Sequence, residues 1–445
     1  MLGFIGLCNC TDCNSQSDSC YELRYHGNPP KHPIRFRLTG AARDRLAVTL
    51  TGVFSPINQK TRPYMRQLAI AAAWHHDSSL RTAVRPPRKR MTGESDHIVA
   101  ELAVRIFADL ADPQTINRLD DGAWKAPFWQ ALSDAGLPLA WVPERLGGAG
   151  ASLAEGFAVL GVAGRFAVAV PLAETLLAGW LLTRAGVAAP NGSMTIAPSR
   201  PSDRIIFDKD GTLSGPAIGI PFASEAQNIA VLAQGEEGVV VALVAASDCT
   251  IGEGQTLAGD PSNIVRFQCV KPLHYAWAPF GLDHTALMLM GSVSRSVQTA
   301  GALESILSLS VSYANERVAF ERPIGKFQAV QHNLARLAGE TAAALAVSGS
   351  AASTIGQSGN IDKSGFFEGA SAKIRCVEAA TEGAAIAHQV FGAIGFTKEH
   401  ILHRFTLRIL AWRDDFGSES YWAAELGRHV AQQGADEFWP MVASR

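Results

Sequence analysis

Cysteines are the first side chains whose type and spacing could do chemistry. Four of the seven cysteines fall within the first twenty residues, as Cys8, Cys10, Cys13 and Cys20. Thiolates hold a structural zinc when a C-x-x-C pair is matched by a second half, and no second half follows here. We therefore expect no metal site. The other cysteines are scattered, a usage that favours a reducing cytoplasm over a disulfide framework.

Carboxylates form the second candidate group. Asp414 and Asp415 come just before a predicted helix that starts near residue 417, and Glu419 lies one turn further on. A carboxylate facing a substrate can act as a general base. An acidic pair ahead of a helix more often caps it, because the helix N-terminus favours negative charge and side-chain acceptors. We expect the capping role and keep Asp415 as the alternative base.

The strongest local feature is ERVAFERPIGKFQAVQHNLA, residues 316–335. It ends one predicted helix, crosses a break at Pro323 and Gly325, and starts the next helix at Gln328. A charged turn between two helices accounts for it without any binding role. Two other segments rich in glycine are PERLGGAG (143–150) and HQVFGAIGF (388–396).

The apolar pattern predicts the elements that carry these segments. Helical spacing predicts helices near 98–110, 124–135, 152–165, 172–185, 283–317, 328–358, 364–392, 398–411 and 417–434. Between them, β-branched clusters predict strands at 205–207, 228–233, 238–244 and 263–270, separated by polar and glycine turns. Long helices joined by short breaks favour an antiparallel bundle.

Charge divides the chain unevenly. Residues 1–91 hold fourteen Lys or Arg against five Asp or Glu, whereas the whole chain has a net charge of −2. We expect residues 1–91 to be a poorly ordered basic appendage, with Met91 as the candidate native start; a basic arm that binds nucleic acid or lipid is the alternative. The acidic remainder disfavours a nucleic-acid role for the whole chain, and no apolar run is long enough to span a membrane.

Together these segments resemble the acyl-CoA dehydrogenase family. The pattern R-x-x-F-x-x-P-I-x-x-F-Q over 317–328 follows a long helix, HQVFGAIGF is similar to the family's Q-x-F-G-G-x-G-(F/Y) segment, and PERLGGAG to its P-E-x-x-G-G-x-G loop. The resemblance covers about residues 93–435. It implies a mainly α fold with an N-terminal α-helical domain (92–188), a middle β-barrel-like domain (189–281) and a C-terminal four-helix bundle (282–445).

The resemblance also implies a chemistry. Enzymes of this family remove the α-proton of an acyl-CoA thioester with a carboxylate while the β-hydride passes to N5 of FAD, which is shared at a subunit interface. Carried over residue by residue, Arg317 would pair with the pyrophosphate of a neighbour's FAD, since a guanidinium matches phosphate geometry. Phe320, Gln328, Gln389 and Gly392 would complete this outer half-site. A purely structural role stays open for Arg317 and Phe320.

The inner half of a flavin site departs from the family pattern. The family carries a strand G-x-K-x-(W/F)-I-(T/S), and alignment on the strand 228–233 puts GPAIGIP (215–221) in its place. Gly219 then stands where the aromatic belongs, and Pro221 where the hydroxyl belongs. Proline also lacks a backbone donor. The acidic, Gly-Ser-containing flavin loop that precedes this strand has no counterpart in the chain.

Both of the family's positions for the catalytic base are empty as well. Counted from Gln389, the glutamate of the E-G-(T/S) motif falls on Phe416. Counted back from Arg317, the alternative glutamate position falls on Gly291. Neither residue can take a proton. Asp415 is offset by one residue, which at a helix start turns a side chain by about 100°.

The family residues that this sequence retains are those expected to reach a partner's flavin. The family residues that it lacks are those expected to serve the chain's own flavin site. The chain therefore resembles the non-catalytic subunit of a heteromeric bacterial acyl-CoA dehydrogenase, inactive alone, in fatty acid or steroid side-chain catabolism. The implied partners are a homologous subunit, an acyl-CoA and an electron-transfer flavoprotein. Two alternatives stay open: a homomeric dehydrogenase using Asp415 as a displaced base, and a non-enzymatic scaffold with the family fold.

Overall fold

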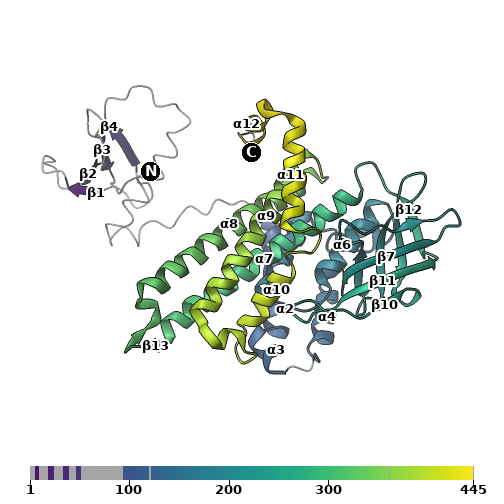
Figure 1. Cartoon of the computed structure of the whole chain (residues 1–445), viewed down its shortest axis with the longest axis horizontal. Helices are drawn as coiled ribbons and strands as arrows, with labels where there is room; N and C mark the ends of the chain where they lie inside the picture. The colour runs from purple at the N-terminus through teal and green to yellow at the C-terminus, as the bar shows by residue number, and fades with distance from the viewer. Residues whose placement is uncertain are drawn as a thin grey trace. The chain divides into compact units, whose positions relative to one another are not determined.

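The computed structural model describes residues 6–9, 19–24, 34–39, 47–51, 94–119, 122–359 and 361–443 (Figure 1). The chain divides into two compact units, Met1–Met91 and Thr92–Arg445, and each is considered by itself.

The first unit contains strands that the sequence analysis did not expect. β1 (Gly6–Asn9), β2 (Ser19–Arg24), β3 (Ile34–Thr39) and β4 (Ala47–Thr51) form an antiparallel sheet in chain order. The signal was present in IRFRLT of β3, where apolar and polar residues alternate as a half-exposed strand requires. Of the clustered cysteines, Cys10 and Cys13 lie outside the described residues.

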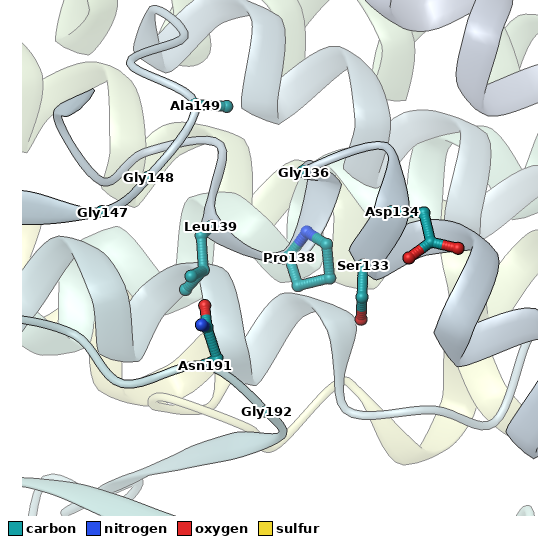
Figure 2. A pocket seen from close by; sticks show the side chains of 10 residues that line it. All are labelled: Ser133, Asp134, Gly136, Pro138, Leu139, Gly147, Gly148, Ala149, Asn191 and Gly192. Atoms are coloured by element: carbon teal, nitrogen blue, oxygen red, sulfur yellow. The ribbon is translucent and has the colours of Figure 1, made fainter.

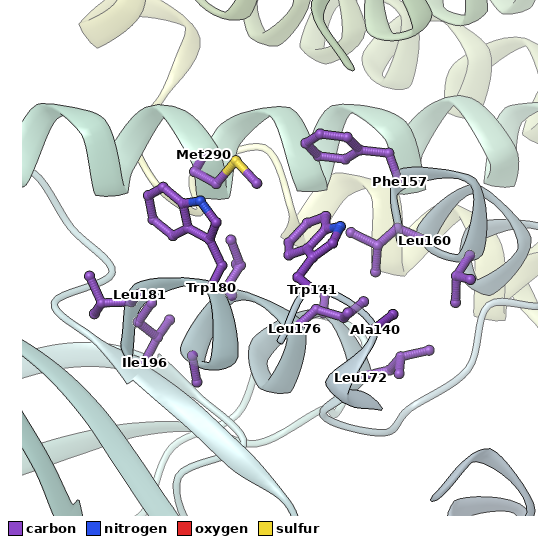
Figure 3. Packing of buried hydrophobic residues seen from close by; sticks show 14 of the residues in the cluster. Ala140, Trp141, Phe157, Leu160, Leu172, Leu176, Trp180, Leu181, Ile196 and Met290 are labelled. Atoms are coloured by element: carbon purple, nitrogen blue, oxygen red, sulfur yellow. The ribbon is translucent and has the colours of Figure 1, made fainter. Parts of the chain in front are cut away.

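The second unit opens with helices that pack through an apolar core. They are α2 (Glu94–Leu110), α3 (Pro113–Leu119), α4 (Lys125–Asp134), α5 (Leu153–Phe166) and α6 (Leu172–Arg184). A capping box starts α5, with Ser152 and Glu155 each accepting a backbone N–H of the other. Figure 3 shows how Trp141 and Trp180 of this region pack together with Met290 of the bundle, so the helical domain and the bundle share one core.

The middle domain is one sheet with its own core. Its strands are β5 (Met194–Ala197), β6 (Ile206–Phe207), β7 (Leu213–Pro221), β8 (Asn228–Gln234), β9 (Val239–Ala245), β10 (Thr250–Gly252), β11 (Ser262–Val270) and β12 (His274–Trp277). The strand order is β10-β11-β7-β6-β8-β9-β12, with β5 beside β8. Pairing is antiparallel except where β5 and β6 run parallel to β8.

The C-terminal domain is a bundle of long helices. Its elements are α7 (His284–Glu316), α8 (Gln328–Ser358), α9 (Lys363–Phe391), α10 (Leu402–Ala411), α11 (Glu419–Gln433) and α12 (Ala435–Ala443). Asp283, Asp362 and Ser418 cap α7, α9 and α11 by accepting a backbone N–H. A short hairpin, β13 (Val318–Ala319) and β14 (Arg322–Pro323), joins α7 to α8 at the end of the bundle away from the sheet (Figure 1).

The expected fold class is confirmed: a helical domain, a central sheet and a C-terminal bundle follow one another. The predicted bounds of α8 match, and those of α7 and α9 differ by one residue at each end. Of the second unit, the strands β5, β10, β12, β13 and β14 and the helices α3 and α12 were not among the predicted elements, and β7 was expected only from the family resemblance. The helix expected from residue 398 begins at Leu402, because a short 3-10 helix η5 (Gly392–Phe396) and a turn follow α9.

Helices α5 and α7 cross at glycines, which brings their backbones together. A Cβ added at Gly301 of α7 would overlap the carbonyl oxygen of Gly161 in α5, and one added at Gly164 would overlap the Gln298 carbonyl. We therefore expect Gly301→Ala to lower the free energy of unfolding by about 1–3 kcal/mol, the usual effect of overpacking. Urea denaturation would measure it.

Gly339→Ala in α8 is the matched control for this prediction. Nothing lies within 4 Å of a Cβ at Gly339, so alanine should be neutral or stabilise the helix by up to about 1 kcal/mol. Equal unfolding free energies for the two variants would contradict the close crossing of α5 and α7.

Candidate functional site

The two positions expected for a catalytic base converge in space. Gly291 lies in α7 and Phe416 lies in the loop between α10 and α11, yet a Cβ built on Gly291 would overlap the Phe416 ring. The ring is fully buried in the same apolar core as Met290. The two positions at which the sequence analysis looked for a carboxylate are therefore joined by a packed phenyl ring, which fits because position 291 is glycine.

The backbone around Phe416 is held on both sides. Phe416 has a φ of 55°, a left-handed conformation that is strained for an aromatic residue. Its N–H donates to the Ser199 carbonyl at 3.1 Å, and its carbonyl accepts from the buried Trp422 indole at 3.0 Å. These contacts fix the inward rotation of the ring, so the conformation is set by the sheet domain as well as by the bundle.

On the sheet side of the same region, the Arg200 guanidinium lies against Gly219. Gly219 of β7 has a φ of 73°, and a Cβ there would lie 2.9 Å from the Arg200 guanidinium. The Ser199 hydroxyl donates to the Gly219 carbonyl at 3.0 Å, which fastens the segment carrying Arg200 along β7. Pro221 ends the strand, and its carbonyl accepts from Thr195 at 2.5 Å. The positions expected for an aromatic and a hydroxyl thus carry neither.

A buried charge network lies directly behind Phe416. Arg295 of α7 donates to Glu174 of α6 at 2.5 Å, to Asp415 at 2.8 Å and to Gln298 at 2.8 Å. Burial raises the pKa of the Glu174 carboxyl, and Arg295 opposes that rise. Burial acts to lower the pKa of Arg295, but the two carboxylates outweigh it and raise the pKa above its ordinary value. Asp415 is thereby tied to a guanidinium.

Lys373 of α9 completes this network from the other side. Its ammonium is buried and donates to the carbonyls of Trp412 and Asp415, both at 2.8 Å. Burial lowers the pKa of Lys373 to about 8. The loop that presents Phe416 is therefore held through its side chain by Arg295 and through its backbone by Lys373.

The outer positions lie at the opposite end of α7 and are open to solvent. Arg317 is the C-cap of α7, and the Phe320 side chain is 88% exposed. Phe320 and Glu321 form the two-residue turn of the β13–β14 hairpin with φ of 52° and 63°, the left-handed pattern of a type I′ turn. Gln328, the first residue of α8, is exposed as well.

An aromatic stack brings the second outer segment to the same end of the bundle. The Tyr313 ring in the last turn of α7 stacks on Phe391 at 4.2 Å, and its hydroxyl donates to the Phe391 carbonyl at 3.3 Å. Gln389 and Gly392 flank Phe391 and are exposed. The structure thus presents all five predicted cofactor-binding residues on the surface and gathers them at one end of the helices.

The glycine loop of PERLGGAG lies elsewhere, at a separate cavity of about 380 Å³ (Figure 2). Gly147, Gly148 and Ala149 form one wall, and Asn191 and Gly192 another. Asp134 is the only charged side chain among its lining residues, and its carboxylate already accepts from Gln130 at 2.7 Å. None of the predicted site residues lines this cavity.

The buried network is what the sequence analysis missed. Glu174, Arg295 and Lys373 are charged residues inside otherwise apolar helical stretches, and such residues are almost never buried unless paired. That signal could have drawn attention to them. Their pairing could not be read, because the Glu174–Arg295 partners are 121 residues apart in the chain.

Two features are absent from the part of the chain that the structure describes. There, no three His, Cys, Asp or Glu side chains are grouped so that they could hold a metal ion. No helix among the same residues is long and apolar enough to cross a membrane.

Comparisons with known proteins agree with this architecture. Residues 284–429 match the acyl-CoA dehydrogenase C-terminal domain. The acyl-CoA dehydrogenase IpdE2 of Mycobacterium tuberculosis is 27% identical, covering 73% of this chain and 91% of that protein. FadE27 of the same organism, also an acyl-CoA dehydrogenase, is 28% identical, covering 77% and 99%. The ChsE4-ChsE5 complex from Mycobacterium tuberculosis contains a chain with a TM-score of 0.70 at 24% identity, covering 78% and 99%.

Residues 284–429 therefore belong to the acyl-CoA dehydrogenase family, and the chain as a whole is similar to proteins of that family. A variant of the Tcur3481-Tcur3483 steroid acyl-CoA dehydrogenase is similar as well, at 25% identity with a TM-score of 0.68 over 77% of this chain. The resemblance on which the sequence analysis relied is confirmed at the level of family and fold.

The contact between positions 291 and 416 gives a testable prediction. Gly291→Ala should lower the free energy of unfolding by about 1–3 kcal/mol, because its methyl group overlaps the phenyl ring. Phe416→Ala should lower it by about 3–5 kcal/mol by leaving a cavity. The double variant should lose less than the sum of the two, because the methyl group enters the space that the ring leaves. Strict additivity in urea denaturation would contradict the contact.

The Arg295 network gives a second prediction. Arg295→Met should lower the free energy of unfolding by about 3–5 kcal/mol, because Glu174 stays buried without its cation. The pKa of Glu174 is already raised in the folded chain, and removal of Arg295 removes the opposing effect. The folded variant then binds a proton more tightly than the unfolded chain, so its deficit should shrink as pH falls from 8 to 5. A pH-independent deficit would contradict this account.

Proposed function

We propose that this chain is a subunit of a heteromeric, FAD-dependent acyl-CoA dehydrogenase, and that it completes a partner's flavin site instead of holding a site of its own. The observation that carries the proposal is the Phe416 ring buried against Gly291. Both positions at which the family places its base are thereby occupied by one packed contact, and neither residue can accept a proton.

The residues of the chain's own inner half-site do not fit FAD. A planar ring system would need an aromatic or apolar wall at position 219, and the Arg200 guanidinium lies against that glycine instead. Ser199 links β7 to Phe416, so the strand and the loop are joined by hydrogen bonds where a cofactor would have to part them. On this proposal, no reaction step takes place in this chain's own cleft.

Asp415 is a poor alternative base for a physical reason. Its carboxylate accepts from Arg295 at 2.8 Å in a pair that is mostly buried. To act as a base, it would have to give up that ion pair as it gained a proton, leaving Arg295 with one carboxylate fewer in a buried setting. This argues against a homomeric dehydrogenase built on Asp415.

The outer half-site does fit a flavin nucleotide held by another subunit. Arg317 offers a guanidinium for the pyrophosphate, Gln328 and Gln389 offer amides, Gly392 leaves the backbone accessible, and Phe320 offers an exposed ring. When bound, FAD would accept the hydride from the acyl-CoA; the part of this chain is to bind and orient the nucleotide. The exposure of these five residues argues against a scaffold that no longer meets flavin.

The names of similar proteins support the parts of the proposal that concern the partner subunit and the substrate. Two similar structures, the ChsE4-ChsE5 complex and the Tcur3481-Tcur3483 steroid acyl-CoA dehydrogenase, are described as pairs of unlike chains. We propose a homologous subunit as the partner, a bulky acyl-CoA such as one with a steroid side chain as the substrate, and an electron-transfer flavoprotein as the acceptor. The free thiols at Cys249, Cys269 and Cys376 suit our proposal that the complex works in the cytoplasm.

The visible spectrum tests this proposal. Purified alone, the chain should be colourless. Purified with a homologous acyl-CoA dehydrogenase encoded beside it, it should give a yellow complex with one flavin for every two subunits. Arg317→Ala should release most of this flavin, because a bidentate phosphate contact is lost. Flavin absorbance and subunit mass, measured on the same sample, give the ratio.

Arg266→Ala is the matched control, since Arg266 is an exposed arginine on β11, far along the chain from the outer half-site. It should leave the flavin content unchanged. A yellow isolated chain that an acyl-CoA reduces would overturn the partner proposal, and a colourless complex with every homologous partner would favour the scaffold alternative.

A further inference from the structure

His388 lies at the corner where α9 ends and the outer half-site begins. It is the residue before Gln389, and its ring is stacked on Phe396 at the end of η5, with centroids 4.1 Å apart and an angle of 19°. Its Nε2 lies 3.0 Å from the Thr406 hydroxyl of α10. One imidazole at the end of α9 therefore contacts both η5 and α10, and η5 itself begins with Gly392.

The hydrogen bonds around His388 favour a proton on Nε2. The Thr406 hydroxyl donates to the Leu402 carbonyl at 3.3 Å, so it accepts from His388 Nε2. His388 Nδ1 is buried without a hydrogen-bond partner among the described residues, and Gly395 packs on it so closely that an added Cβ would lie 3.3 Å away. A proton on Nδ1 would be a buried donor with no acceptor, which is costly. This surrounding favours the neutral ring with its proton on Nε2.

A second histidine at this corner, His400, also needs an unprotonated Nδ1. His400 Nδ1 accepts from the backbone N–H of Leu402 at 3.1 Å, so a proton there would break that bond. Its ring packs on Phe391 with centroids 4.6 Å apart. His403 donates from Nδ1 to the His400 carbonyl at 2.7 Å and can do so in either charge state.

We propose that His388 is a positioning residue for the outer half-site, that it holds η5 and hence Gln389 and Gly392 in place only while its Nδ1 is unprotonated, and that acidification releases this segment. His400, in the turn after η5, acts in the same way. The proposal rests on the proposed function for its consequence, which is loss of the partner's flavin at mildly acidic pH.

The charges around the corner do not compensate a protonated ring. The titratable groups on the neighbouring elements are Tyr313, Glu316 and Arg317 at the end of α7, Lys398, Glu399 and His400 in the turn after η5, and His403, Arg404 and Arg408 on α10; η5 has none. Burial alone lowers the pKa of His388, and burial followed by His403 lowers the pKa of His400. Their folded pKa values lie below the unfolded value, so stability here is lost as pH falls below about 6.5.

Two substitutions separate position from charge. In His388→Gln the side-chain amide can reach the place of Nε2 and still donate to Thr406, but it cannot titrate. In His400→Asn the amide oxygen can accept from Leu402 in place of Nδ1. The double variant H388Q/H400N should hold η5 in place at every pH, whereas His388→Ala should leave η5 released at every pH. His429→Gln on α11, whose ring centroid lies 5.2 Å from that of Phe366, is the matched control.

The first measurement uses the isolated full chain, so that it does not depend on the flavin. Nitrogen-15 NMR of histidine-labelled protein should show the Nε2–H form at His388 and His400. Hydrogen exchange over residues 392–401, corrected for intrinsic rates, should rise several-fold between pH 7.5 and 5.5 in the wild type and in H429Q. In H388Q/H400N it should stay flat. An Nδ1–H form at His388, or equal pH dependence in the double variant, would overturn the proposal.

The second measurement uses the complex with the homologous subunit. Flavin should be retained at pH 7.5 and released near pH 5.5 by the wild type, retained at both by H388Q/H400N, and weakly held at both by His388→Ala. Flavin release at the same pH from the wild type and the double variant would refute the role of the corner. A complex that never binds flavin would instead refute the proposed function, and the exchange experiment would still decide whether the corner opens.

Discussion

The buried guanidinium of Arg295 is the interaction on which the rest of this architecture depends. A guanidinium is stable away from water only if it is paired and hydrogen-bonded. Arg295 donates hydrogen bonds to Glu174, Asp415 and Gln298. These partners belong to α6, to the loop after α10 and to α7 itself. The network therefore joins the N-terminal domain to the bundle and fixes the loop residue next to Phe416. Lys373 of α9 holds the same loop by donating to the carbonyls of Trp412 and Asp415.

That constraint bears on the proposed absence of a base, because the two positions concerned are part of a packed core. Phe416 can enter the core only because position 291 has no side chain, and its left-handed backbone is held by Ser199 and Trp422. A glutamate at 416 would be buried in an apolar core with its nearest guanidinium already shared by two carboxylates. A single reversal would thus create an uncompensated charge, so the plugged state is stabilised by all of its neighbours together.

The sequence alone supports the fold because its helices are long and periodic. The bounds of α7, α8 and α9 follow from apolar spacing, caps and the Pro-Gly break, which are local signals. It also identifies Gly291 and Phe416 as unable to act as bases. It does not reveal that the two touch, nor that Arg200 covers Gly219, because these contacts join segments far apart in the chain. The strands β1–β4 were missed for another reason, since short alternating runs between basic and proline-rich segments carry a weak signal.

The outer end of the bundle differs, because it holds a strained turn that few contacts within the chain stabilise. The type I′ turn of the β13–β14 hairpin favours Asn-Gly, because both residues are left-handed, yet here it holds Phe320 and Glu321. A left-handed conformation costs a residue with a side chain about 1–2 kcal/mol, and Phe320 recovers little of this within the chain, since it is 88% exposed and meets Phe327 only edge to face. Strain that the fold itself does not need is the mark of a position shaped by something outside the chain. The inner site is closed by contacts that satisfy one another, whereas the outer residues are held exposed at a cost to stability, and this contrast favours a surface kept for a partner.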